Sequence, residues 1–281
     1  MVKWYNTESE HIVAEFDIQI DLMNFISPER FNEWMQNMDK AYEAYAELVG
    51  GVPQYPLNCN KIHIIKVKKE EESQYEKMQG EKITDAAAWT FCNYKYIYVK
   101  NDSLISALMK IEEYGDWNFM FLHEMGHAFD ISKNWVFHDE LSANLKMAYL
   151  FKKYDGEIKV LVNCTWGEEL ATIYEEIEAC YLHAFNDSFI YTFAQNPLRF
   201  HNDGLTYILL DLIDGDWEHM KGVYDRIKNM DLNGSNSAKY ENFLKIMDTE
   251  LAKKNVLSVY EDKYVKYHKF ICESLDKKEA E

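Results

Sequence analysis

The sequence has few of the residues that mark linkers and disulfide frameworks. Its 281 residues include only 4 prolines, 11 glycines and 5 cysteines. No stretch is rich in proline, glycine or serine, and there is no internal repeat or low-complexity tract. The composition therefore predicts one large domain, or two lobes around a cleft, with ample apolar material for a core.

Positive charge is scarce as well. The chain has 30 Lys and Arg residues against 48 Asp and Glu residues, which gives a formal net charge of −18 at pH 7. Nucleic acids and anionic membrane surfaces repel such a protein, so neither is expected as its main partner. No apolar run approaches the roughly 20 residues that a membrane-spanning helix needs.

The cysteines do not suggest a disulfide framework. They are odd in number, scattered and mostly set in apolar segments, which favours free buried thiols, and none has zinc-ligand spacing. The five are Cys59, Cys92, Cys164, Cys180 and Cys272. Residues 1–6 lack the apolar core of a signal peptide. A cytoplasmic protein is expected if the chain is complete, and a secreted one if an export signal has been removed.

The most informative segment is residues 123–127, His-Glu-Met-Gly-His, which matches the HExxH pattern of zinc-binding helices. Histidines four residues apart project from the same face of a helix, so His123 and His127 can converge on one metal ion. Glu124 is rotated away from the metal axis. Its carboxylate is therefore the candidate general base, placed to deprotonate a zinc-activated water.

The flanks of this motif indicate a buried helix. Buried histidine and glutamate side chains need partners, and a metal ion supplies them, so Zn²⁺ is the expected cofactor. A surface helix that carries two histidines by chance would not explain the flanks. The surrounding apolar residues are Phe119, Met120, Leu122, Met125, Ala128 and Phe129.

A catalytic zinc site needs a third protein ligand and an open position for water. Residues 140–152 are predicted to form a second helix, with Asp139 as its N-cap, and the loop before it is long enough to fold it back against the first. Glu140 then faces the two histidines as the third ligand. Asn144, one turn later, can accept a hydrogen bond from a ligating histidine.

Other sources of the third ligand are weaker. The metzincin pattern fails, because Asp130 and Lys133 stand where it has glycine and histidine. His138 lies at the end of the loop, where a satisfied or solvent-facing histidine is the commoner case. The acidic segment 166–178 is predicted to form a helix, and its carboxylates favour a solvated face over ligation.

Together these residues resemble the enhancin-like, mucin-degrading gluzincin peptidases. The similarity extends more weakly to residues 31–50 and 205–226, but only the zinc segment is specific. The specific pieces are Gly115-Asp116-Trp117, His123 to His127, Trp135, and Glu140 to Asn144. One departure is that Ala128, Phe129 and Asp130 follow the second histidine, where the family often has Asn and Gln. This leaves zinc chemistry intact and makes the mucin preference an open question.

The resemblance implies an α+β, zincin-like metallopeptidase. A mixed αβ lobe over about residues 1–130 would end in the zinc helix, and a mainly helical lobe would follow over about residues 131–281. The implied substrates are O-glycosylated, mucin-type proteins. Some zinc toxins similar to anthrax lethal factor take the third ligand from a more distant helix, which keeps the segment 166–178 as an alternative.

The N-terminal half predicts the elements that such a fold needs. Residues 14–22 alternate between apolar and polar side chains, as in a half-buried strand. A helix is expected from Ser27-Pro28-Glu29 to Gly50-Gly51, because a cap and a proline precede it and glycines follow it. Strands are predicted over 61–68 and 88–100, with a charged loop or hairpin between them.

Two further expectations concern the cleft and the C-terminal half. The strand through Tyr94, Tyr96 and Tyr98 is either the cleft edge that pairs with substrate backbone or a sheet face that covers the core. After residue 150 the chain is predicted to be almost entirely helical. Breaks are expected near residues 155–156, 196–197, 214–215 and 233–234.

The expected function is zinc-dependent hydrolysis of peptide bonds in a protein or glycoprotein substrate, with oligomeric state left open. His123, His127 and Glu140 would hold the metal, and Glu124 would move the proton. Four residues are unranked candidates for stabilising the oxyanion: Tyr174, Tyr181, His201 and Tyr207.

Three alternatives remain at this point. One is a toxin-like intracellular zinc protease with a distal third ligand. Another is a non-catalytic zincin-like module that binds glycoprotein, against which the intact Glu124 counts. The last is a structural zinc protein with His138 as a fourth ligand.

Overall fold

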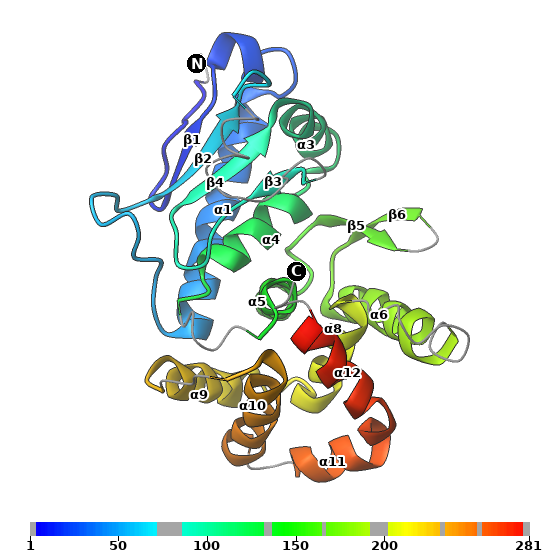
Figure 1. Cartoon of the computed structure of the whole chain (residues 1–281). Helices are drawn as coiled ribbons and strands as arrows, with labels where there is room; N and C mark the ends of the chain where they lie inside the picture. The colour runs from blue at the N-terminus through cyan, green and yellow to red at the C-terminus, as the bar shows by residue number, and fades with distance from the viewer. Residues whose placement is uncertain are drawn as a thin grey trace.

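The computed structural model of the chain describes residues 4–71, 86–131, 137–164, 167–191, 202–230, 234–251 and 255–277. A sheet-containing part is followed along the chain by a largely helical part. In Figure 1 the sheet lies at the top and most of the later helices lie below it. Within the described ranges, no helix is both long and apolar enough to cross a membrane. In chain order the elements are β1 (Ile12–Glu15), η1 (Ile18–Leu22), α1 (Pro28–Val49), β2 (Ile62–Val67), β3 (Ala88–Trp89), β4 (Tyr96–Lys100), α3 (Asn101–Tyr114), α4 (Phe119–Ala128), α5 (Asp139–Lys153), β5 (Val160–Cys164), β6 (Gly167–Ala171), α6 (Tyr174–Phe185), η4 (Asn186–Tyr191), α8 (Asn202–Ile213), α9 (Trp217–Lys228), α10 (Asn236–Glu250), α11 (Val256–Lys263) and α12 (Val265–Lys277).

A four-stranded sheet in the order β1-β2-β4-β3 supports the first part. β1 and β4 both pair with β2 in parallel, whereas β3 pairs antiparallel with β4. Alternate side chains on the strands point to opposite faces of the sheet. One face is buried and belongs to the same hydrophobic core cluster as helices α1, α3 and α4. That buried face is formed by Ile12, Ala14, Ile62, Ile64, Ile97 and Val99.

Helix α1 begins and ends where the sequence predicts. The Ser27 hydroxyl accepts a hydrogen bond from the backbone of the first turn, and Pro28 occupies the first helical position. Gly50 ends the helix in the left-handed conformation, with φ at +64°, which glycine adopts at little cost.

Helix α1 also anchors α4, the helix that carries the HExxH motif. The indole Nε1 of Trp34 donates to the carbonyl of Trp117 at 3.1 Å. The hydroxyl of Tyr45 donates to the carbonyl of Leu122 at 3.2 Å. Both donors are buried, so these hydrogen bonds fix the position of α4 along α1.

Of the predicted strand over residues 14–22, only residues 14 and 15 lie in a strand, at the end of β1. The Asp17 carboxylate accepts hydrogen bonds from two backbone amides of the next turn and begins η1. The side chains of Ile18 and Ile20 are 42% and 65% exposed. The apolar alternation is therefore misleading here, because local capping by Asp17 turns the chain into a helical coil.

The predicted strand over residues 88–100 is two strands. β3 and β4 are joined by a turn in which Asn93 has φ at +60°. β4 lies inside the sheet between β2 and β3, so of the two alternatives for the strand through Tyr96 and Tyr98 the cleft edge is contradicted. Among the described strands, the edge position on that side belongs to β3.

The described residues after 150 are largely helical as predicted, but the helix expected over residues 166–178 is wrong in its first part. β5 and β6 form an antiparallel hairpin, and β6 occupies the first part of the segment 166–178 that was predicted to be helical. α6 begins only at Tyr174. The breaks near residues 155–156 and 214–215 are confirmed between elements, whereas the one near 196–197 and residue 233 lie outside the described residues.

The expectation of free cysteines holds for three of them. Cys59, Cys92 and Cys272 are not part of a disulfide. Cys180 on α6 is disulfide-bonded, so the prediction of free thiols is wrong for this residue. An apolar sequence around a cysteine does not distinguish a buried thiol from a buried disulfide.

One hydrophobic core cluster runs through both parts of the chain, from Ile12 in β1 to Leu275 in α12. Helices and strands both contribute to it, and the sheet and most of the helices occupy separate regions of the molecule (Figure 1). The mixed α+β class predicted from the sequence is therefore confirmed.

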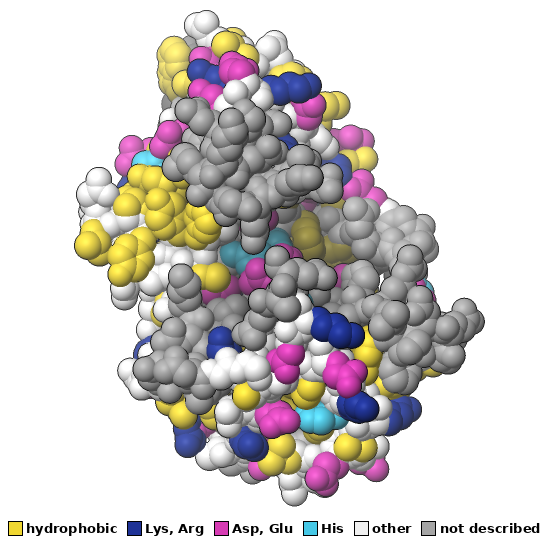
Figure 2. Space-filling view, viewed as in Figure 1, with side chains coloured by type: hydrophobic (Ala, Val, Ile, Leu, Met, Phe, Trp, Pro, Cys, Tyr) yellow, Lys and Arg dark blue, Asp and Glu magenta, His cyan; other side chains and the backbone are white. Residues whose placement is uncertain are grey.

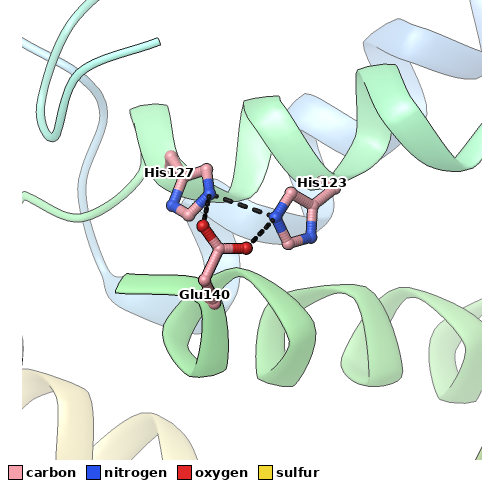
Figure 3. Close-up of side chains that lie close together, drawn as sticks. All are labelled: His123, His127 and Glu140. Carbon is pink, nitrogen blue, oxygen red and sulfur yellow. Dashed lines mark hydrogen bonds and ion pairs between the residues drawn. The ribbon is translucent and has the colours of Figure 1, made fainter. Parts of the chain in front are cut away.

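Helices α4 and α5 approach each other so closely that one position between them has no room for a side chain. A Cβ atom on Gly126 would lie 2.9 Å from the Cα of Ala143. The N-cap of α5 is His138 rather than Asp139, and the helix otherwise has the predicted bounds within one residue at each end. The two helices run antiparallel, so the first turn of α5 faces the second half of α4 (Figure 3).

Replacement of Gly126 by alanine tests this contact. We expect Gly126→Ala to lower the free energy of unfolding by about 1–2 kcal/mol, because overpacking costs about 1–3 kcal/mol and alanine recovers up to about 1 kcal/mol of helix propensity. Denaturant titration of the metal-free protein measures this change. Gly222→Ala is the matched control, because a Cβ there meets only the flexible Glu250 carboxylate at 3.4 Å. Equal stability of the two variants would contradict the close packing.

Candidate metal centre

His123 and His127 occupy one face of α4 and direct their imidazoles to the same point. Their Nε2 atoms lie 3.1 Å apart, and the rings are nearly perpendicular. His127 is buried and His123 is half-buried, with Phe119 stacked on the His123 ring. The structure therefore brings together the two histidines that the sequence pairs.

Glu140 completes this group from the first turn of α5. Its Oε2 lies 2.9 Å from Nε2 of His123, and its Oε1 lies 3.8 Å from Nε2 of His127. Figure 3 shows the carboxylate between the two rings. Nitrogen and oxygen ligands about 2.0–2.1 Å from one zinc ion at tetrahedral angles are about 3.3 Å apart, so the three groups have the spacing of a zinc site.

The other sources of a third ligand are used elsewhere. Nδ1 of His138 accepts a hydrogen bond from the backbone amide of Leu141 at 3.4 Å and caps α5. Glu168 lies on β6 and pairs with Lys110. Among the described residues, the only groups of three potential ligands that contain His123 or His127 have Glu140 as the third member. His138 as a fourth ligand is therefore not supported either.

Glu124 lies beside the two histidines, with its carboxyl group facing the edge of the sheet. The backbone N–H of Thr90, just after β3, hydrogen-bonds to it. Burial raises the pKa of this carboxyl group and Glu140 adds to the rise, whereas His127 and His123 oppose it. The group is thus close to the metal-binding atoms and is not one of the three that converge. This is the arrangement that a general base requires.

Asp130 contacts His127 at Nδ1, the ring nitrogen that faces away from His123 and Glu140. This contact was not predicted from the sequence. Oδ2 of Asp130 lies 3.8 Å from Nδ1 of His127, which is an electrostatic contact rather than a hydrogen bond. Burial alone would raise the pKa of Asp130, but Lys146 and His127 lower it overall. Conversely, burial alone would lower the pKa of His127, and Asp130 with two glutamates raises it overall.

A fully buried ion pair holds Asp130 in this position. Lys146 on α5 pairs with the Asp130 carboxylate, and both side chains are almost completely excluded from solvent. Nζ of Lys146 also donates to the Ser142 hydroxyl at 2.8 Å, and that hydroxyl donates to Asp130. In the sequence, the feature that could have indicated this contact is a carboxylate three residues after the second histidine. There it counts only as a departure from the metzincin and gluzincin patterns.

Asn144 does not have the predicted role. Its Nδ2 donates to Asp203 at 2.9 Å and to the hydroxyl of Thr206 at 3.3 Å, both on α8. The side chain therefore joins α5 to α8 instead of orienting a ligating histidine. Helical spacing placed Asn144 near Glu140, but it did not reveal that α8 packs on that side of α5.

A large cavity lies beside the N-terminal end of α4, and its lining does not include His123, His127 or Glu140. It has a volume of about 820 Å³ and is lined by Phe119 and Met120 of α4 together with residues of α3, β5, α6 and η4. Histidine and acidic side chains are also visible near the middle of the face shown in Figure 2. The lining is strongly acidic, with Lys110 as its single lysine or arginine against Asp102, Asp116, Glu168, Asp187 and Asp203.

The four candidates for stabilising an oxyanion are placed differently. Tyr181 lines the cavity, and its buried hydroxyl has no hydrogen-bond partner among the described residues. Tyr174 also has a buried hydroxyl without such a partner, but it does not line the cavity. Tyr207 is half-buried on α8. His201 lies outside the described residues.

Comparison with known proteins gives the fold alone. No protein-family model matches the chain, and no curated protein does. A solved structure of a functionally unknown conserved protein from Bacillus anthracis str. Ames is 14% identical with a TM-score of 0.57, and a mutant so described from the same organism is 12% identical with a TM-score of 0.55. Each match covers 95% of this chain and 50% of the other, so this chain spans about half the length of those proteins.

The third ligand can be tested by comparing two glutamates. We expect Glu140→Ala to lose zinc affinity, because it removes one of the three converging ligand atoms. Glu168→Ala should keep it, because that carboxylate pairs with Lys110. Competition with a zinc-binding dye measures both. Retention by the first variant and loss by the second would place the third ligand on the β5–β6 hairpin.

The support of His127 by Asp130 gives a separate prediction. Asp130→Asn alone should destabilise the fold by about 3–5 kcal/mol, because Lys146 remains buried and unpaired. Asp130→Asn combined with Lys146→Met removes both charges and should restore most of this stability. Zinc affinity should still fall about 10–100-fold, as for other partners of a ligating histidine. Unchanged zinc affinity in the folded double variant would show that Asp130 serves only the buried ion pair.

Proposed function

We propose that this protein is a zinc-dependent endopeptidase of the gluzincin type, with a zincin-like fold. The observation that carries the proposal is the convergence of His123, His127 and Glu140 on one point, with Glu124 beside them. In this proposal the zinc helix α4 ends a mixed αβ lobe over about residues 1–130, and residues 131–281 form the helical lobe.

The donor set suits zinc. Two imidazole nitrogens and one carboxylate leave a fourth position open, as in catalytic rather than structural zinc sites. Zinc held there supplies Lewis acidity, which polarises a scissile carbonyl and activates water. Glu124 accepts the proton from the attacking water and then delivers it to the nitrogen of the leaving amine.

The surroundings of the centre suit a polypeptide substrate. β3 is an edge strand that passes next to α4, and the amide of Thr90 just after it contacts Glu124. An extended substrate can add to such an edge through backbone hydrogen bonds. The cavity beside α4 is large enough for side chains. Tyr181 lines it with a hydroxyl that has no hydrogen-bond partner among the described residues, which makes it the best-placed of the three oxyanion candidates that the structure describes.

Two features bear on substrate and compartment. The acidic lining of the cavity favours basic side chains in the substrate, and the resemblance to mucin-degrading peptidases adds O-glycosylated proteins as a class to test. The disulfide at Cys180 is typical of an oxidising compartment, which favours a secreted protein over a toxin-like intracellular protease.

Activity of a Glu124 variant separates a catalyst from a binding module. Wild-type protein and Glu124→Gln are incubated with plain peptides and O-glycopeptides, and products are identified by mass spectrometry. We expect Glu124→Gln to lose at least about 10²–10⁴-fold in rate, because positioned proton transfer contributes that much. Zinc content should be unchanged, since Glu124 is not among the three converging groups.

The control for this experiment is Glu175→Gln, an exposed glutamate on α6 that should leave the rate unchanged. A wild-type protein that holds zinc but cleaves neither substrate class, with Glu124→Gln indistinguishable from it, would favour a zincin-like module that binds glycoprotein without cutting it.

A further inference from the structure

A second group of metal-binding side chains lies far along the chain from the first. Glu241 is on α10, and His268 and Cys272 are one turn apart on α12. Their ligand atoms all lie within 4.8 Å of one another. The two residues on α12 are half-buried and Glu241 is exposed, so the group is accessible from solvent.

The three side chains meet at a single nitrogen. Nε2 of His268 lies 3.3 Å from Oε1 of Glu241 and 3.6 Å from Sγ of Cys272. With the usual zinc bond lengths and tetrahedral angles, a nitrogen and an oxygen ligand are about 3.3 Å apart, and a nitrogen and a sulfur ligand are about 3.6 Å apart. Both observed distances agree with those of ligands that share one zinc ion.

The same geometry argues against a cysteine nucleophile. In a catalytic triad the base contacts the nucleophile with one ring nitrogen and the orienting acid with the other. Here Glu241 and Cys272 both approach Nε2 of His268. An acid at that nitrogen competes with the thiol for it instead of orienting the ring. Convergence on one nitrogen is the arrangement of metal ligands.

The other ring nitrogen of His268 is held by a tyrosine pair. Nδ1 lies 3.1 Å from the hydroxyl of Tyr260, and that hydroxyl accepts a hydrogen bond from Tyr240 at 3.2 Å. Tyr240 is completely buried and Tyr260 nearly so. This contact fixes the imidazole with Nε2 toward Glu241 and Cys272, as outer partners of ligating histidines commonly do.

We propose that Glu241, His268 and Cys272 form a second divalent-metal site, suited to zinc and independent of the HExxH centre. On binding, the S–H bond of Cys272 breaks, its proton passes to solvent, and a thiolate–metal bond forms. Imidazole, thiolate and carboxylate together are typical zinc ligands, and solvent can complete the fourth position.

A third group of possible metal ligands, Glu10, His11 and Glu43, is a weaker candidate than the group on α10 and α12. Nε2 of His11 lies 3.9 Å from Glu10 and 3.7 Å from Glu43, and both glutamates are exposed. The His11 ring is stacked on Tyr42 with centroids 4.3 Å apart. That group lacks the sulfur ligand of the site on α10 and α12, and both of its contacts to the imidazole are longer than those of His268.

A metal at this second site would join α10 to α12. Tyr267 of α12 packs edge-on against Phe185 and Phe189, at the end of α6 and in η4. Ser188 of η4 lines the large cavity beside α4. The metal would therefore stabilise the helices that form one wall of this cavity, without taking part in the chemistry at Glu124.

Cobalt titration tests the second site separately from the first. The protein is freed of metal with a chelator and titrated with Co²⁺ in the absence of oxygen and of any disulfide-reducing agent, so that the disulfide at Cys180 stays intact. Thiolate ligation gives a strong charge-transfer band in the near ultraviolet, and the HExxH centre has no sulfur ligand to produce one. We expect wild-type protein to show this band, complete by two cobalt ions per chain because the HExxH centre also takes up cobalt, and we expect Zn²⁺ to abolish it.

Variants assign the band to these residues. Cys272→Ser should lose it, whereas Cys92→Ser, a matched change at another free cysteine, should keep it. Glu241→Gln should weaken cobalt binding at least about tenfold, since even outer partners of a ligand are worth about 10–100-fold. Glu261→Gln, an exposed glutamate on α11, is its control. Added Zn²⁺ should also raise the Tm of a variant lacking His123 and His127, and should not do so when Cys272 is replaced as well.

No band in wild-type protein, or a band that persists in Cys272→Ser, would overturn the second site. Neither result affects zinc binding by His123, His127 and Glu140, so the two proposals fail independently. Circular dichroism of each metal-free variant shows whether a lost band reflects a lost ligand or a lost fold, and Glu241→Gln, on the protein surface, provides the test if Cys272→Ser does not fold.

Discussion

The contact between α4 and α5 at Gly126 and Ala143 is the constraint on which the candidate site depends. Because Gly126 has no side chain, the backbone of α5 can come close enough for Glu140 to reach both histidines. Glu140 is in the first turn of α5, so a shift of this helix by a fraction of its pitch would remove the third ligand. The hydrogen bonds from Trp34 and Tyr45 of α1 hold the other side of α4 in place.

A buried ion pair joins α5 to the residues just after α4. Removing Asp130 and Lys146 from water is costly, and the pair by itself is weak evidence of stability. Its position is informative, because Asp130 faces Nδ1 of His127, the ring nitrogen that would not bind the metal. The pair thus couples the orientation of a ligand on α4 to the packing of α5. The three converging side chains and Glu124 lie on these two helices, and the buried ion pair connects them.

The sequence was sufficient for features whose causes are local. The spacing of the HExxH motif predicts the convergence of His123 and His127, and the helix start near Asp139 predicts the place of Glu140. The caps of α1 are likewise read from neighbouring residues.

Features that depend on tertiary packing could not be read in this way. The partner of Asn144 is on α8, the neighbours of β4 are set by sheet order, and Asp130 acquires its role from Lys146. The β5–β6 hairpin and the turn at Asp17 show that alternation and acidic composition do not determine backbone conformation.

The central claim is that His123, His127 and Glu140 hold one zinc ion, and crystallography at the zinc absorption edge tests it most directly. The account predicts an anomalous peak within bonding distance of both Nε2 atoms and the Glu140 carboxylate. Zinc-supplemented crystals with no peak at that point would contradict it.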